Sequence, residues 1–535
     1  MTTAIASTAA GTAPIAKPAT ISHRPLLGVT AVLVGAFISS INVRLTTVGL
    51  ADIRGGLSLG FDEGSWFSTA FTATQLAVCA SAAWLSLLLG PRRFLLWSST
   101  ILAIASALPP LTRDPTLLLA IQIVRGLAVG SFIPATVGFI IRELPPRWWR
   151  WGFAAYSFRF VFSQNIAASI EAFYGEHGLW PWMFWQNTLL TPIMIILIWF
   201  GMPREPISRT LLRQGDWTGI VYIGLGLTLL YAALDQGNRL DWLNSGTVVG
   251  LLLAGGLLLV AFVANESLVA QPLFDLRVLQ RPNVWIAAVM IAVYGFGSTA
   301  TAFILPDYLT RVQGLRSLQV ADVVNWIALP QVLLVPLIAW LLRYLDARLT
   351  LALGLALIAI GSWMDTGLTH DWVNDDFLPS QLVEAAGLAF GLTSLVFFAI
   401  ANITPAQAVT AAGVIQASRL LGNELGSAFI QTFVRVREQI DSNLAGLNLM
   451  RGADTTEGTL TQFSQLFTDR AAGTGDPTAQ GLLQLGSLVR REAYVLAYID
   501  GFWIVAWVLT ISLLLLLFLT PPPPNYLTRP CILAK

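Results

Sequence analysis

Charged residues are scarce in this chain. Only 11% of its 535 residues are Asp, Glu, Lys or Arg, and lysine occurs at just two positions, whereas an ordinary soluble domain carries about 25% charged residues. Hydrophobic residues make up 55%, and the mean hydropathy is +0.68. This composition excludes a soluble globular protein. The net charge of +1, without a basic block, gives no reason to expect nucleic-acid binding. We therefore predict a polytopic membrane protein.

Residue types that carry metal, redox and phosphate chemistry are also rare. The three histidines, His23, His177 and His370, are dispersed, and the two cysteines lie far apart at Cys79 and Cys531. This spacing favours neither a metal site nor a disulfide framework, and we expect no cofactor. No GxxxxGK(S/T) loop occurs, so an ATPase of that type is not built into the chain. We predict that the protein is not an enzyme.

Long apolar runs fill most of the sequence. A helix of about 20 apolar residues crosses a bilayer core of about 30 Å. The runs predict an all-α membrane protein with about fourteen transmembrane helices. The predicted spans are 26–50, 66–89, 94–112, 116–141, 152–174, 183–202, 217–235, 246–264, 283–306, 318–342, 349–367, 378–401, 406–434 and 496–520.

The distribution of arginine predicts the orientation, because cytosolic segments carry an excess of Lys and Arg. Segments predicted on one side carry sixteen: Lys17, Arg24, Arg92, Arg93, Arg142, Arg147, Arg150, Arg204, Arg209, Arg213, Arg277, Arg281, Arg343, Arg348, Arg529 and Lys535. Short loops on the other side carry five: Arg54, Arg113, Arg239, Arg311 and Arg316. We therefore place both tails, 1–25 (disordered) and 521–535, in the cytosol. Segment 435–495 is predicted to form short amphipathic helices in the periplasm.

One span contains a charge in the middle of an apolar stretch. Residues 117–136 read LLLAIQIVRGLAVGSFIPAT, with Arg125 near the centre. A guanidinium at that depth costs about 2.5–3.5 kcal/mol on insertion scales, so it should face other helices or water. Gly126 and Gly130 lie four residues apart on one face, a spacing that lets another helix approach closely.

Five stretches together resemble a known family. They are RGLAVGSFIPAT at 125–136, INVRLTTVGLADIRGGL at 41–57, WPWMFWQN at 180–187, SRLLGNELGSAFI at 418–430 and AYVLAYIDGFW at 493–503. Their order and spacing resemble the fourteen-span drug:proton antiporters of the major facilitator superfamily, multidrug-efflux permease type. The resemblance implies two six-helix bundles, 26–202 and 283–520. A linker at 203–282 would hold two inserted spans.

The resemblance also implies a function. The chain would be a secondary active exporter of amphipathic small molecules, working by alternating access in a bacterial inner membrane and coupled to protons. Related Gram-negative exporters work with a periplasmic adaptor and an outer-membrane channel, so these are expected partners. Two alternatives stay open: a transporter-like sensor that does not transport, and a membrane-embedded transferase.

The chain departs from the family pattern at residues used for proton coupling. Asn42 stands where the first span of the family usually has an aspartate, and Leu87 replaces the aspartate of the loop after the second span. Gly90, Arg92 and Arg93 of that loop remain. The chain is therefore identified as a member of a divergent subgroup.

The fifth span has lost a motif and gained an acid. Residues 167–172 read AASIEA where the family usually has GPxxGG, so Glu171 is new. We expect Glu171 to lie between Arg44 and Arg125, as a gate latch, a proton carrier or a static buried pair. Arg159 is expected to line an inner vestibule.

The C-terminal half repeats the pattern of a charge beside closely packed glycines. Arg419, Gly422 and Gly426 share one helical face, and Glu384 begins the same spacing in the twelfth span. Glu424, on the span of Arg419, is a further candidate for transport or coupling. Five aspartates near outer span ends are expected to be mostly interfacial: Asp235, Asp307, Asp322, Asp365 and Asp500.

Overall fold

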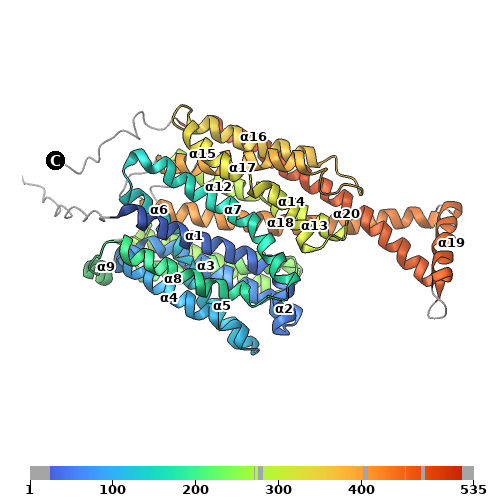
Figure 1. Cartoon of the computed structure of the whole chain (residues 1–535), viewed down its shortest axis with the longest axis horizontal. Coiled ribbons are helices and arrows are strands. Elements are labelled where there is room, and N and C mark those ends of the chain that lie inside the picture. Colours follow the sequence, from blue (N-terminus) through green and yellow to red (C-terminus); the bar gives the residue numbers. More distant parts are fainter. Residues whose placement is uncertain are drawn as a thin grey trace, which may run out of the picture.

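The computed structural model describes residues 24–269, 272–274, 281–401, 408–451, 453–470 and 476–520. All regular secondary structure within these ranges is helical, which confirms the predicted fold class. The helices run side by side in one elongated bundle (Figure 1). Of the predicted tails, 1–23 and 521–535 lie outside the described residues, as does Arg277 of the linker.

The first half of the chain forms six long helical units. They are α1 (Pro25–Val48), α3 (Phe61–Leu89), α4 (Pro91–Ala107), α5 with α6 (Pro115–Gly130 and Phe132–Glu143), α7 (Trp149–Glu176) and α8 (Trp182–Gly201). A short helix, α2 (Leu50–Leu57), follows α1. The start of α5 is encoded locally: the Asp114 side chain accepts from the Thr116 amide at 2.9 Å, and Pro115 occupies the first helical position.

Two further helices separate the halves. α10 (Trp217–Gly237) and α11 (Gly246–Leu268) follow the short α9 (Arg209–Gln214) and pack against each other. α10 also packs on α3, where the Thr228 hydroxyl donates to the Ala73 carbonyl at 3.2 Å. The pair is therefore attached to the first half of the bundle.

The second half contains six more helical units. They are α12 with α13 (Pro282–Gly297 and Leu305–Arg311), α14 with α15 (Ser317–Ala328 and Gln331–Leu341), α16 (Ala347–Asp365), α17 (Leu378–Ala401), α18 (Ala408–Arg451) and α20 (Pro477–Ser512). A π-helical turn, η5 (Ala300–Ile304), joins α12 to α13, and the 3₁₀ helix η7 (Leu513–Phe518) extends α20.

Twelve helices in the described part of the chain are long and apolar enough to cross a membrane. α7 and α18 are as long but more polar, because α7 carries Arg159 and Glu171 and α18 carries Arg419 and Glu424. Both run within the bundle (Figure 1). The count of fourteen spans stays a prediction.

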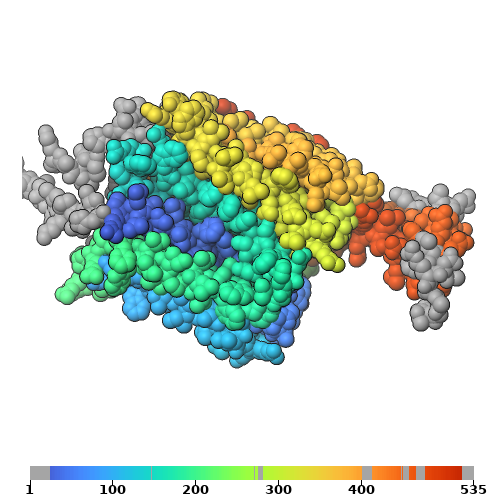
Figure 2. Space-filling model, viewed as in Figure 1, coloured from blue at the N-terminus to red at the C-terminus, as the bar shows by residue number. Residues whose placement is uncertain are grey.

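Residues 435–451, 453–470 and 476–495, the described parts of segment 435–495, form an arm that projects beyond the bundle (Figure 2). The prediction of short amphipathic helices is only partly right. α18 and α20 continue without a break into the arm, and only α19 (Ala453–Arg470) is a separate short helix. No proline or glycine pair interrupts residues 431–445, so the helix has no local reason to end. Arg437 pairs with Asp500 at 2.5 Å, which ties α18 to α20 at the base of the arm.

Glycines set the closest helix contacts. A Cβ added at Gly422 would lie 2.7 Å from both Cβ and the carbonyl oxygen of Ala292, so α18 and α12 pack backbone to backbone. At Gly126 it would meet the backbone of Phe71 and Gln75 on α3. Small residues allow this approach where lipid provides no hydrophobic drive for helix association.

The glycine contacts yield a first prediction. Gly422→Ala should lower the thermal stability of the purified protein, by roughly 1–3 kcal/mol for an overpacked contact. Gly256→Ala is the matched control, because its Cβ would meet nothing within 4 Å; it should leave stability unchanged or raise it slightly. Thermal unfolding in the same detergent measures both, and an equal loss in the two variants would contradict the contact.

Candidate functional site

Arg125 lies fully buried inside the first half of the bundle. Its guanidinium donates to the Asn42 Oδ1 of α1 at 3.0 Å and to the Ser106 hydroxyl of α4 at 3.1 Å. It also donates to Gln122, one turn earlier on α5. One charged side chain thereby joins three helices, and every partner is neutral.

Asn42 is held by a second buried amide. Asn42 and Asn187 of α8 exchange two hydrogen bonds, each of 2.7 Å. The rings of Phe184 and Phe71 lie 4.8 and 5.3 Å from the Arg125 guanidinium, where a cation is attracted to an aromatic face. The substitution of aspartate by Asn42 thus leaves Arg125 with oriented dipoles in place of a counter-charge. Asn187 was not singled out from the sequence, although it ends the WPWMFWQN stretch.

Arg44 contacts the second half of the bundle. Its guanidinium donates to the Ala302 carbonyl at 2.8 Å, within the π-helical turn η5. Such turns leave backbone groups without regular helical partners and often occur at functional sites. A second contact between the halves joins the Ser169 hydroxyl of α7 to Asn325 of α14 at 3.0 Å.

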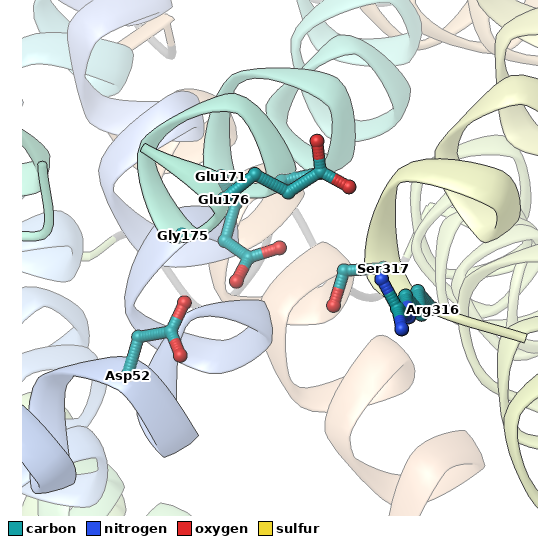
Figure 3. Close-up of a pocket in the computed structure, with 7 residues that line it drawn as sticks. Asp52, Glu171, Gly175, Glu176, Arg316 and Ser317 are labelled. Carbon is teal, nitrogen blue, oxygen red and sulfur yellow. The ribbon is translucent and has the colours of Figure 1, made fainter. Parts of the chain in front are cut away.

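The expected position of Glu171 between Arg44 and Arg125 is wrong. Glu171 instead lines a cavity of about 510 Å³ with Asp52, Glu176 and Arg316. Figure 3 shows these acidic side chains on one side of the cavity and Arg316 on the other. The reason is helical phase: α7 turns Glu171 toward α2 and the start of α14, whereas Arg125 is enclosed by α1, α4 and α8. The Glu171 Oε2 atom is buried without a hydrogen-bond partner.

Arg159 and Arg419 meet near the boundary of the two halves. Arg159 donates to the Ala36 carbonyl at 3.2 Å and to the Ser40 hydroxyl, both on α1. The Arg419 guanidinium of α18 lies 4.5 Å from the Phe160 ring of α7. Both side chains are buried, with 3% and 6% of their surface exposed. Arg159 thus lies in a closed interior, not in the open vestibule that we predicted.

Two carboxylates are buried together in the second half. Asp365 of α16 and Glu384 of α17 are both fully inaccessible, and the Ser362 hydroxyl donates to Glu384 at 3.2 Å. Both oxygens of Asp365 and one of Glu384 lack hydrogen-bond partners. The prediction of an interfacial Asp365 is therefore wrong, because tight packing of α16 on α17 encloses it. Glu424 is also buried, beside Tyr231 of α10.

The loop after α3 has the conformation that its glycine permits. Gly90 has φ of +83°, a region that favours glycine. Arg92 lies over the Trp199 ring at 4.5 Å, and Arg93 is exposed. The loop therefore packs against the end of α8.

Comparison with known proteins assigns the family. The sequence model described as Major Facilitator Superfamily matches residues 32–428, which is most of the chain. The chain belongs to the major facilitator superfamily. It is therefore a multi-pass membrane transporter rather than an enzyme.

Curated relatives of this major facilitator protein cover most of its length. The multidrug export protein EmrB of Escherichia coli is 20% identical over 511 residues, 94% of this chain and 97% of that protein. The colistin resistance protein EmrB of Acinetobacter baumannii is 22% identical over 405 residues, 75% and 78% of the two chains. The solved structure of the proton:xylose symporter XylE has a TM-score of 0.54 at 12% identity, covering 90% of this chain and 94% of that one, which shows the common fold.

The Arg125 network of this major facilitator protein yields a second prediction. Arg125→Ala should abolish transport while the protein still inserts, because it removes the cation that joins α1, α4 and α5. Arg125→Lys should recover little activity, since the compact ammonium lacks the planar fork of donors that reaches partners on different helices. Substrate uptake and membrane content measure the two effects separately.

The control for this experiment is Arg213→Ala, an exposed arginine on α9. It should retain normal uptake. If Arg125→Ala also retained uptake, the network would be a support for packing alone.

Proposed function

We propose that this chain is a secondary active exporter of amphipathic small molecules. The observation that carries the proposal is the nearly full-length similarity to a protein named for multidrug export, on a fold shared with a solved transporter. Small-molecule sites of such transporters lie near the membrane midplane between two halves that rock against each other. A non-transporting sensor or a transferase remains an outcome of the export test below.

The geometry supports alternating access. The helix α7 packs against α14, α15 and α17 of the second half, and small apolar residues such as Ala168 and Ala321 form part of this contact. The polar bonds across it, such as that from Arg44 to the Ala302 carbonyl, can break and reform. Within the first half, Arg125 is buried and each of its three nitrogens donates to a partner. The halves can therefore move as bodies. The cavity around Glu171 lies between them and serves as a gate that closes by Arg316 approaching the acids.

We place the protein in the inner membrane with both ends in the cytosol. The start of α1 and the end of α20 lie at one end of the bundle, and α19 lies beyond the opposite end (Figure 1). The excess of arginine in the loops on the side of the termini supports a cytosolic assignment for that side. The arm would then extend into the periplasm.

We assign proton coupling to Glu384 together with Asp365. Two carboxylates buried without a cation repel each other unless they share a proton. Neither forms a salt bridge within the described residues, and their unpaired oxygens leave room for that proton. A carboxylate pair on α16 and α17 would take over the role left open by Asn42 and Leu87. The pair formed by Asp52 and Glu171 is the second candidate for this role.

The third prediction tests export and coupling together. In proteoliposomes, an imposed pH gradient should drive accumulation of a fluorescent amphipathic substrate by the wild-type chain. Glu384→Gln keeps the shape but cannot release a proton, so gradient-driven accumulation should be lost while exchange of substrate against substrate continues. Accumulation with and without the gradient measures the effect.

Asp322→Asn is the matched control, because Asp322 is an exposed carboxylate on α14. It should leave gradient-driven accumulation intact. Unchanged coupling in Glu384→Gln would contradict the assignment, and Glu171→Gln would then be tested in the same assay. Absence of both accumulation and exchange in the wild type would refute export and leave the sensor or the transferase.

The arm supports the proposal of a periplasmic adaptor and an outer-membrane channel as partners. It is the one long extramembrane segment of the described chain, and it presents exposed leucines such as Leu444, Leu447, Leu482 and Leu483. An adaptor with an apolar helical surface would cover them.

The fourth prediction separates the adaptor from transport itself. Leu483→Arg, at a position with 75% of its surface exposed, should leave uptake in proteoliposomes unchanged. It should lower the resistance of intact cells, because export across two membranes needs the adaptor. Gln480→Arg serves as the control, because it introduces the same charge on the same arm without removing an exposed leucine. Equal resistance of all three strains would contradict docking at Leu483.

A further inference from the structure

The buried arginines of this chain differ in how fully they are paired. Arg125 makes three hydrogen bonds inside one half of the bundle. Arg159 makes two, both to α1, and its Nε and Nη2 atoms are buried with no acceptor. The chain thus contains two buried arginines, of which Arg125 has a hydrogen-bond partner at each nitrogen and Arg159 does not.

Arg419 brings a second cation to Arg159. It comes from the other half of the bundle, and its Nε donates to Gln416 at 3.2 Å. The Gln416 Nε2 atom is itself buried and unpaired. The Arg419 guanidinium lies over the ring of Phe160, the residue next to Arg159 on α7, which brings the two cations to the same place between the halves. Neither arginine faces a carboxylate within the described residues. Donors therefore outnumber acceptors at this point.

An uncompensated pair of buried cations is costly, and an anion removes the cost. Burial of a charge is tolerated when it is paired and hydrogen-bonded. Guanidinium groups bind carboxylates in a planar, two-bond geometry that an ammonium cannot match. The missing acceptors around Arg159 and Gln416 are of the kind that a carboxylate supplies.

The surroundings of the two cations are aromatic. Phe160 lies under Arg419 and Tyr156 lies 4.4 Å from Arg159, both on α7. Tyr294 of α12 is fully buried nearby, and its hydroxyl donates a hydrogen bond to the Leu388 carbonyl at 3.1 Å. These rings thus offer apolar contact, while Arg159 and Gln416 supply the unpaired polar donors.

We propose that Arg159 and Arg419 together bind the carboxylate of an amphipathic anion, which makes anionic amphipaths the preferred substrates. The inference that the bound anion is a transported substrate rests on the proposed export function. The carboxylate would lie between the two halves and would replace repulsion between the guanidiniums by attraction to both. Binding would therefore draw the halves together around the substrate.

The test compares three probes that share one ring system. Naphthalene-2-carboxylate, its neutral carboxamide and its cationic carboxamidine are bound to the full chain in lipid nanodiscs, and affinity is measured by equilibrium dialysis. The wild type should prefer the carboxylate over the carboxamide by roughly 10- to 100-fold, the range of charged hydrogen bonds. The carboxamidine should bind most weakly.

Matched variants assign the preference to residues. Arg159→Gln and Arg419→Gln should each remove most of the preference while carboxamide binding stays within about twofold. Arg159→Lys should keep part of it, because the charge remains and the planar fork is lost. Arg213→Gln, on the exposed α9, should behave as the wild type. Thermal unfolding identifies variants that fail to fold. If Arg159→Gln does not fold, the carboxylate preference of Arg419→Gln and Arg159→Lys tests the proposal.

Three results overturn the proposal. The first is equal wild-type affinity for the carboxylate and the carboxamide. The second is an unchanged preference in both Gln variants. The third is displacement of the carboxylate by an equal concentration of chloride, because that result indicates a resident inorganic anion. Binding is read without transport, so the two proposals fail separately. A carboxylate preference without export in proteoliposomes would refute export and leave the anion site. Export of the carboxamide alone would refute the anion site and leave export.

Discussion

The structure depends on how positive charge is held in a medium that disfavours it. A cation buried in low dielectric needs either an opposite charge or a full set of oriented dipoles. Arg125 has the dipoles, supplied by Asn42, Ser106 and Gln122. This network fixes the distance between α1, α4 and α5 and so determines the shape of the first half. On another face of α5, Gly126 lets that helix pack against the backbone of α3.

The same constraint is met less completely where the halves face each other. Arg44 uses a single carbonyl of the π-helical turn, and its Nε atom is buried without a partner. Arg159 and Gln416 retain unpaired donors at the same boundary. Arg125 is bonded at each of its three nitrogens within one half, whereas Arg44 and Arg159 keep unpaired nitrogens where the halves meet, so the polar contacts there are the ones that can rearrange. That division of polar contacts is what a two-body transporter requires.

The sequence predicts the fold of this chain well and its sites less well. Apolar runs indicate spans because length and hydropathy alone decide insertion, and the glycine spacing at Gly126 and Gly422 indicates close packing. The partner of a buried charge cannot be read this way. The sequence places Glu171 and Arg125 in the same outer half of the membrane, yet the phase of α7 directs Glu171 to another face. Asn187 joins the Arg125 network through Asn42, a pairing of residues 145 positions apart that no local pattern encodes.

The unbroken course of α18 has a mechanical consequence. The helix has 44 residues, carries Arg419 in the bundle and continues through the arm to Arg451. At 1.5 Å per residue it is a rod of about 66 Å, and its part beyond Arg435 is about 24 Å long. A tilt of roughly 10° would move the far end of that part by about 4 Å. Arg419 and Arg435 are also about 24 Å apart along the helix, so the arm acts as a lever with two equal sides that carries a motion at the buried arginine to the outside of the membrane at about its full size.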